Sequence, residues 1–156
     1  MEIENFSLQL VNLVEIKLDR LNECEQLPSL RNLPCLQILH IFGLHKVTCI
    51  MGSSNILSSN RKAVLLFPSL KELRLLNMLS LVEWSGAMIP PAGSSAKVFP
   101  NLEKLYLYGL PKLDVLPNLG IQTHLQRLEI CHCLSLTCLQ DMTIFQLHFG
   151  SQIAQK

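Results

Sequence analysis

Four residues in the last fifth of the chain, Cys131, His132, Cys133 and Cys138, have side chains that could bind a zinc ion. Structural zinc sites usually take their cysteines from C-x2-C pairs, whereas the spacing here is C-H-C-x4-C. If Cys133 points into the protein core while Cys131 and His132 point outward, the four side chains do not converge. We therefore interpret the cysteines as structural and predict no metal site.

Patterns that support catalysis are missing from the sequence. No serine lies in a nucleophile elbow, and no Cys–His or carboxylate pair can be assigned to a pocket. No G-x-x-x-x-G-K-(S/T) loop occurs, so we expect neither ATP binding nor ATP hydrolysis. We predict that the chain is not an enzyme and uses no cofactor.

Composition narrows the function classes further. The 156 residues carry a net charge of +1 without a basic cluster, so nucleic acid is not an expected partner. No apolar run approaches the ~18 residues that span a membrane, and the first twenty residues do not form a secretory signal. Six cysteines without a signal indicate reduced thiols. We expect a cytoplasmic protein, with the nucleus as the alternative.

The elements that position these side chains belong to a repeat. In residues 67–84, FPSLKELRLLNMLSLVEW, one set of apolar residues is spaced 3, 2, 3, 3 and 3 apart. The set is Leu70, Leu73, Leu75, Met78, Leu81 and Trp84. Neither an amphipathic helix nor a half-buried strand has this spacing. Five blocks follow the pattern L-x-x-L-x-L-x-x-φ-x-x-φ-x-x-φ, in which φ is apolar or Cys. The blocks start near residues 13, 36, 70, 102 and 125.

This pattern predicts an α/β-type leucine-rich-repeat solenoid of about five coils. The two leucines that are two residues apart would point inward from a short strand. The following spacing of three would form an irregular or 3₁₀-like return with few true helices. A large residue that ends a coil, such as Trp84, would fill the core. Stacked coils would form a curved parallel β-sheet on the concave face.

The repeat divides the chain into three regions. We predict an N-terminal remnant or edge strand in residues 1–12, the solenoid in 13–139 and a divergent tail in 140–156. Segments 52–66 and 85–98 are rich in Gly, Ser and Pro and are predicted insertions between coils. Because neither end shows a polar capping repeat, we expect a fragment that is marginally stable or aggregation-prone.

The ninth position of each block departs from the generic repeat. Asparagine or cysteine usually binds the turn backbone there, but four of the five blocks have a larger apolar residue. We therefore expect the backbone groups of the turns to find other partners. The five residues are Leu21, Leu44, Met78, Leu110 and Cys133.

Residues between the inward positions of the strands form the predicted contact surface for a protein partner. Exposed aromatic residues near arginine are typical of interface anchors, and Phe42, Leu76 and Tyr108 would form an apolar stripe. The alternative interpretation is a mixed surface that only solvates the strands. The candidate contact residues are Glu15, Lys17, Asp19, Arg20, His40, Phe42, Glu72, Arg74, Leu76, Asn77, Lys104, Tyr106, Tyr108, Arg127, Glu129 and His132.

Several stretches resemble the leucine-rich-repeat region of plant intracellular nucleotide-binding (NB-ARC) disease-resistance receptors. One of that family's segments has a cysteine pair followed by two Leu-Pro steps, and one of its phrases ends in Glu-Trp. The likeness covers roughly residues 10–140. The matching residues are Cys24-Glu25, Leu27-Pro28, Leu33-Pro34, Glu83-Trp84 and the stretches 99–117 and 125–139.

This resemblance implies a protein-binding module in plant defence. Its partner would be a pathogen effector, a host protein that the receptor guards, or the receptor's own nucleotide-binding domain, which this sequence lacks. Two alternatives remain open. One is a truncated receptor fragment without function. The other is a leucine-rich-repeat adaptor of the ubiquitin system, which would need an F-box-like helical segment that residues 1–12 do not supply.

Overall fold

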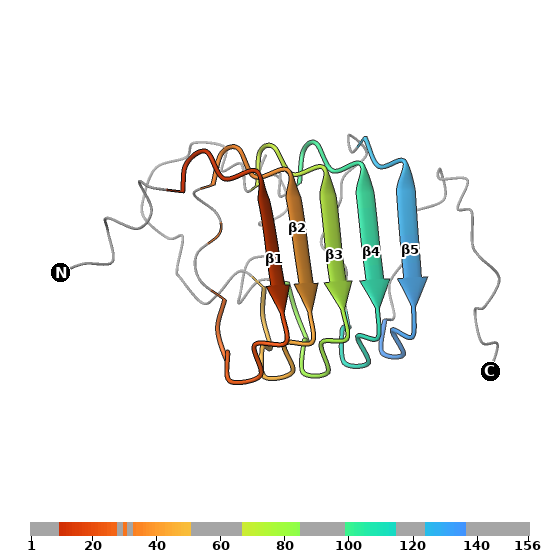
Figure 1. Ribbon diagram of the computed structural model, residues 1–156. Coiled ribbons are helices and arrows are strands. Elements are labelled where there is room, and N and C mark those ends of the chain that lie inside the picture. Colours follow the sequence, from red (N-terminus) through yellow and green to blue (C-terminus); the bar gives the residue numbers. More distant parts are fainter. Residues whose placement is uncertain are drawn as a thin grey trace, which may run out of the picture.

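The described part of the chain forms a parallel β-sheet in the computed structural model (Figure 1). The structure describes residues 10–27, 30, 33–50, 67–84, 99–114 and 124–136, and none of these is helical. The strands pair in chain order, which confirms the predicted parallel sheet. They are β1 (Glu15–Asp19), β2 (Ile38–Phe42), β3 (Glu72–Leu76), β4 (Lys104–Tyr108) and β5 (Arg127–Cys131).

Each strand alternates between inward and outward side chains. In β3, Leu73 and Leu75 are buried, whereas Glu72, Arg74 and Leu76 face outward and are only partly buried. A shift of one residue would turn both leucines to the outward face, so the hydrophobic pattern determines the register. Every strand begins two residues after the first leucine of its block.

The register of the sheet aligns the outward residues into three rows that cross the strands. These rows are defined by Cα partners in neighbouring strands. The first row is Glu15, Ile38, Glu72, Lys104 and Arg127. The second row is Lys17, His40, Arg74, Tyr106 and Glu129. The third row is Asp19, Phe42, Leu76, Tyr108 and Cys131.

A residue with left-handed backbone follows every strand. The φ angles at these positions lie between 50° and 69°. The residues are Arg20, Gly43, Asn77, Gly109 and His132. In the first four, the amide donates a hydrogen bond to the last carbonyl of the next strand, as from Asn77 to Tyr108 at 2.7 Å. Arg20, Asn77 and His132, predicted among the outward strand residues, therefore lie one residue past the strand ends.

The described parts of the returns consist of single turns and contain no 3₁₀ helix, unlike the 3₁₀-like return that the spacing predicts. A turn before β3 closes with a bond from the Leu70 amide to the Phe67 carbonyl at 3.3 Å. Another after β3 joins Leu81 to Met78 at 3.4 Å. Because the chain extends again after one such bond, a helix does not propagate. Every third side chain still points inward.

Side chains bond backbone carbonyl groups in the turns before the strands, whereas the missing asparagine ladder concerned the turns after the strands. The Ser69 hydroxyl donates to the Pro34 carbonyl at 2.5 Å, one coil earlier in the stack. The Asn101 amide donates to the Pro68 carbonyl at 2.6 Å in the same way. These bonds connect successive coils on the side where the chain enters each strand.

The core lies behind the sheet and consists mostly of leucine. Trp84 is buried, which confirms its prediction as a core residue, and its ring lies 5.9 Å from that of Phe99. Phe99 in turn stacks on Phe67 with ring centroids 5.5 Å apart. These three buried aromatic side chains form part of the core.

Leu21 occupies an inward position of the repeat pattern but lies outside the buried core. Its side chain is 46% exposed, whereas Leu44, Met78 and Leu110 at the same position of later coils are fully buried. β1 is an edge strand of the sheet. Among the described residues, Leu21 therefore has a neighbouring coil on one side only.

Several predicted regions lie outside the described residues. They include residues 1–9, both insertions and the tail 140–156. Within the part of the chain that the structure does describe, no helix is long and apolar enough to cross a membrane.

Candidate functional site

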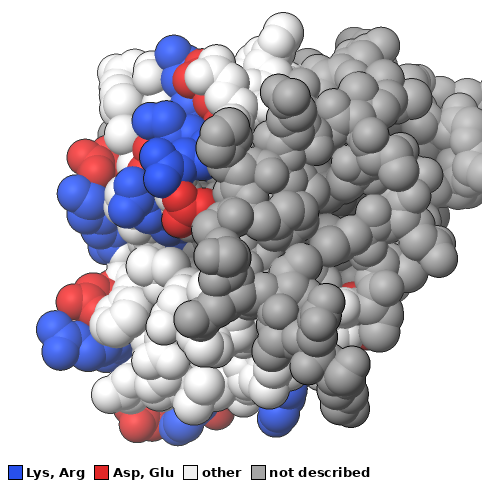
Figure 2. Space-filling view, turned by 90° about the vertical axis from the view of Figure 1, so that its right-hand side faces the viewer, with Lys and Arg blue, Asp and Glu red and all other residues white. Residues whose placement is uncertain are grey.

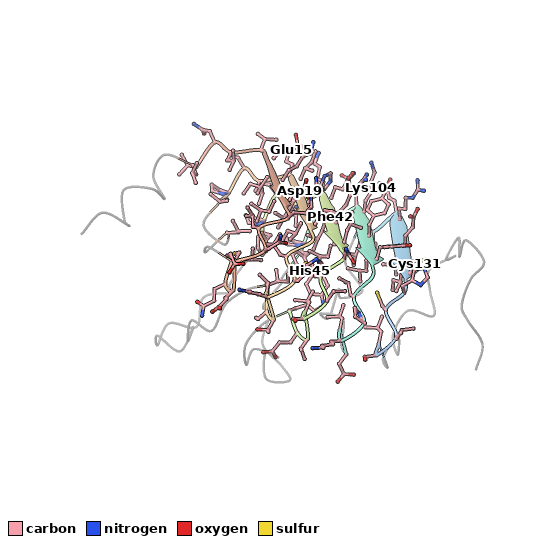
Figure 3. All side chains as sticks on the ribbon, turned by 60° about the horizontal axis from the view of Figure 1, so that its bottom comes forward. Glu15, Asp19, Phe42, His45, Lys104 and Cys131 are labelled. Carbon is pink, nitrogen blue, oxygen red and sulfur yellow. The ribbon has the colours of Figure 1, made fainter. Side chains whose placement is uncertain are left out.

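The outward face of the sheet separates charged from apolar side chains. The first and second rows are mostly charged, and the third row is mostly apolar. Figure 2 shows blue and red atoms gathered at the upper left of the molecule, with white atoms below them and further charged atoms at the lower left and bottom. Glu15 and Lys104 lie near the start of their strands, while Phe42 and Cys131 lie at the ends (Figure 3).

Glu72 is the centre of the charged part of the face. Its side chain is only 14% exposed and receives one cationic or imidazole group from each of three adjacent strands. His40 Nε2 lies 2.9 Å from Glu72 Oε1, and Arg74 Nε donates to the same oxygen at 2.7 Å. Lys104 Nζ lies 3.5 Å from the other carboxylate oxygen. These contacts fix the carboxylate between β2 and β4.

The surroundings of Glu72 favour its ionised form. Burial opposes ionisation, but the hydrogen bonds with His40 and Arg74 and the charges of Arg74 and Lys104 outweigh it. Together they hold the pKa of this carboxyl below its ordinary value near 4.5. Glu72 is therefore a fixed negative charge at neutral pH.

Tyr106 connects this centre to β5. The guanidinium of Arg74 lies 4.5 Å from the centre of the Tyr106 ring, and that of Arg127 lies 5.7 Å from it. Arg127 Nε also donates to Glu129 at 2.7 Å. Each arginine therefore has both a carboxylate and an aromatic partner, which restricts its side chain before any ligand binds.

The third row forms an apolar strip beside these charges. Phe42 is 38% exposed and Tyr108 is 50% exposed, with the half-buried Leu76 aligned between them. The ring of His132 meets that of Tyr108 edge to face at 5.0 Å. An aromatic side chain that stays exposed beside fixed charges can bury apolar area on a partner.

Charged residues on β1 and directly after it form more exposed pairs. Lys17 Nζ lies 2.9 Å from Glu15, and Arg20 Nε lies 3.1 Å from Asp19. All four side chains are largely exposed, and such surface pairs contribute little to stability. The predicted contact residues therefore include a partly buried group around Glu72 on β2 to β4 and more exposed ion pairs on β1 and β5.

Sequence patterns did not indicate a hollow at the start of the strands. It has a volume of about 240 Å³. Its residues precede the strands and lie outside the apolar pattern, so no spacing marks them. They are Gln37, Ser69, Lys71, Asn101, Glu103 and His124.

The cysteines of the last described coil do not form a metal site among the residues that the structure describes. Cys133 points behind the sheet, where its sulfur lies 3.8 Å from the Leu107 carbonyl oxygen. Burial raises the pKa of its thiol, which disfavours the thiolate that zinc needs. Cys131 belongs to the outward third row, and Cys138 lies outside the described residues.

Comparison with known proteins finds a similar protein in a plant. The chain matches no family model and no solved structure. Over 106 residues, or 65% of the chain, it is 30% identical to a protein of Arabidopsis thaliana named disease resistance RPP13-like protein 1. The chain spans about 9% of the length of that relative.

Proposed function

We propose that this chain is a protein-binding leucine-rich-repeat module of plant immune-receptor type. Its coils occupy residues 13–139, and its outward strand face contacts a partner during recognition of a pathogen protein or restraint of the receptor. The observation that carries the proposal is the ordered group of Glu72, Arg74 and Tyr106 beside an exposed apolar strip. The likeness to a disease resistance protein supports the same role.

The chemistry of the face favours a protein partner. Arginine and tyrosine are enriched among residues that dominate binding energy at protein interfaces. Arg74 and Tyr106 are already held by neighbours, so their ordering costs less on binding. Glu72 and Glu129 lie among the cations of the face, and these carboxylates would repel a nucleic-acid backbone.

The same proposal assigns the chain to a non-catalytic role in the cytoplasm. The protein would act as one part of a longer receptor, in which other regions supply nucleotide binding and signalling. A fixed scaffold with partners on an exposed face is sufficient for that role.

Proximity labelling in Arabidopsis leaf cells tests the proposal. The full 156-residue chain is fused to a labelling enzyme. It is compared with a face variant that combines Phe42→Ser, Arg74→Glu and Tyr108→Ser. We expect the face variant to lose at least about tenfold of the labelling of specific partners, because such residues commonly cost more than 1 kcal/mol when removed.

A return-side variant provides a matched control. It combines Leu79→Ser, Val82→Ser and Lys112→Glu, which also removes two exposed apolar side chains and reverses one cation. We expect this control to label the same proteins as the unmodified chain. If the face variant labels the same set as the control, the outward face is not the binding surface.

A further inference from the structure

The two outer strands of the sheet have unpaired edges within the described part of the chain. β1 pairs with β2 only, and β5 pairs with β4 only. Their inward residues, Ile16 and Leu18 in β1 and Leu128 and Ile130 in β5, are only partly buried. Unpaired edges with apolar residues behind them are templates for another strand.

We propose that, in the 156-residue chain taken by itself, β5 of one copy pairs in parallel with β1 of a second copy, so that copies of this chain associate head to tail. The described sheet is parallel throughout and constant in register, so a second copy can continue it without a change of geometry. This pairing uses the strand edges and requires no partner on the outward face.

Charges on the two edges are complementary when the register is continued. Arg127 of one copy falls opposite Glu15 of the next in the first row, and Glu129 falls opposite Lys17 in the second row. Both pairs have opposite charge. Opposite charges across neighbouring strands stabilise a sheet, and like charges destabilise it.

Symmetric pairing of identical edges lacks this match. Two copies of β1 paired antiparallel about their centres would place Lys17 opposite Lys17 and Glu15 opposite Asp19, all of like charge. Two copies of β5 would place Glu129 opposite itself. The charge pattern therefore selects head-to-tail association over a two-fold dimer.

Exposed apolar residues lie at both ends of the stack. Val14 and Leu21 are each 46% exposed beside β1, and Leu134 is 83% exposed beside β5. A continued register would bring Leu128 against Ile16 and Ile130 against Leu18. Burial of these apolar surfaces would favour association, and the charges would determine which strands pair and in which register.

The backbone after β5 has the conformation that makes the hydrogen bond between neighbouring strands elsewhere in the sheet. The residue after each of the first four strands donates its amide to the last carbonyl of the next strand, as Gly109 does to Cys131 at 2.9 Å. His132 has the same left-handed backbone. Its amide would bond the Asp19 carbonyl of the second copy. Because such an interface is not self-complementary, it extends into open chains whose length rises with concentration.

Sedimentation velocity of the full chain tests the proposal with paired charge swaps. The β1 swap is Glu15→Lys with Lys17→Glu, and the β5 swap is Arg127→Glu with Glu129→Arg. Each swap leaves net charge and the ion pair within its strand unchanged. Each places like charges opposite one another across the proposed interface. We expect the unmodified chain to form larger species between about 1 and 100 µM, with association at least about tenfold weaker in either swap.

Recombining the swaps distinguishes complementarity from damage to the fold. A chain that carries both swaps, and an equimolar mixture of the two single swaps, should recover association because opposite charges face each other again. A swap of the exposed pair Glu23→Lys with Lys46→Glu, 2.7 Å apart between the first two coils, is the control and should associate normally. Circular dichroism at low concentration should be the same for all variants.

Three results would overturn the proposal. The first is an unmodified chain that stays monomeric throughout the concentration range, which would mean that another segment of the polypeptide covers the strand edges. The second is association that either single swap leaves unchanged. The third is failure of the double swap and of the mixture to recover association while circular dichroism shows that the variants remain folded.

Discussion

The inner strands β2, β3 and β4 and the edge strands β1 and β5 have the same apolar pattern but different burial. The inward residues of the inner strands are at most 1% exposed, whereas those of the edge strands are only partly buried. The sequence of a coil determines which side chains point inward. The neighbouring coils determine how far those side chains are removed from water. The stability of each coil therefore depends on the coils packed on either side of it.

The polar face shows the same contrast. Glu72 in β3 and Glu15 in β1 occupy the same row. Glu72 has partners from β2 and β4 as well as from its own strand, but the ion pair of Glu15 is with Lys17 within β1. Glu72, which has strands on both sides, therefore has more partners than Glu15 on the edge strand.

Removing one buried leucine from an inner strand should give the largest effect. Leu75→Ala in β3 should lower the free energy of unfolding by about 2–5 kcal/mol, because it leaves a cavity in a fully packed core. Leu18→Ala occupies the equivalent position in β1, where the side chain is only partly buried. It should cost about half as much or less, because less apolar area returns to water.

Urea unfolding at low protein concentration measures both variants, and the slope with denaturant reports whether unfolding stays cooperative. Equal losses from Leu75→Ala and Leu18→Ala would contradict the comparison. They would mean that each coil is stabilised by its own residues and that neighbours contribute little.

Strand positions and outward rows could be predicted from the sequence because one short interval marks each strand. The two inward residues in the middle of each block fix the strand and its facing direction, as with Leu73 and Leu75. Blocks of the same length around the strand then align residue by residue. Phe42, Leu76 and Tyr108 align because each occupies the same position of its block.

Other features depended on contacts that no spacing encodes. The partners of Glu72 are determined by side-chain conformations on three strands. The turn bonds of Ser69 and Asn101 come from positions outside the apolar pattern. The exposure of Leu21 depends on its place in the stack, because the same pattern position is buried in the next three coils.

Replacing each carboxylate of the first row by its amide should change the free energy of unfolding by less than the leucine substitutions do, and by different amounts at the two positions. Glu72→Gln should cost about 1–2 kcal/mol at pH 7, because Arg74 and Lys104 lose a partly buried charged partner. Glu15→Gln should change the free energy of unfolding by less than about 0.5 kcal/mol, because its ion pair is exposed. Chemical unfolding at pH 7 measures both.

Lowering the pH should remove the difference. The pKa of Glu72 is lower in the folded protein than in the unfolded chain, so ionisation stabilises the fold above the unfolded pKa. That contribution disappears as pH falls through the folded pKa. Between pH 7 and about 3, the unmodified protein should therefore lose more stability than Glu72→Gln. Parallel pH profiles for the two proteins would show that the Glu72 contacts do not stabilise the fold.

The smallest expected contrast concerns the residues that follow the strands. Gly109→Ala after the inner strand β4 should cost about 1 kcal/mol or less. A β-carbon is disfavoured at its φ of 66°, and reduced freedom of the unfolded chain offsets only part of that cost. The nearest atom to an added β-carbon is 3.5 Å away, so the cost comes from the backbone conformation and involves no clash.

His132→Ala after the edge strand β5 should change the free energy of unfolding by no more than about 0.5 kcal/mol, because His132 already has a β-carbon at a φ of 55° and its side chain is exposed. Thermal unfolding can compare the two variants. If His132→Ala lost more stability than Gly109→Ala, the ring contact of His132 with Tyr108 would contribute more to stability than the backbone strain at position 109 costs.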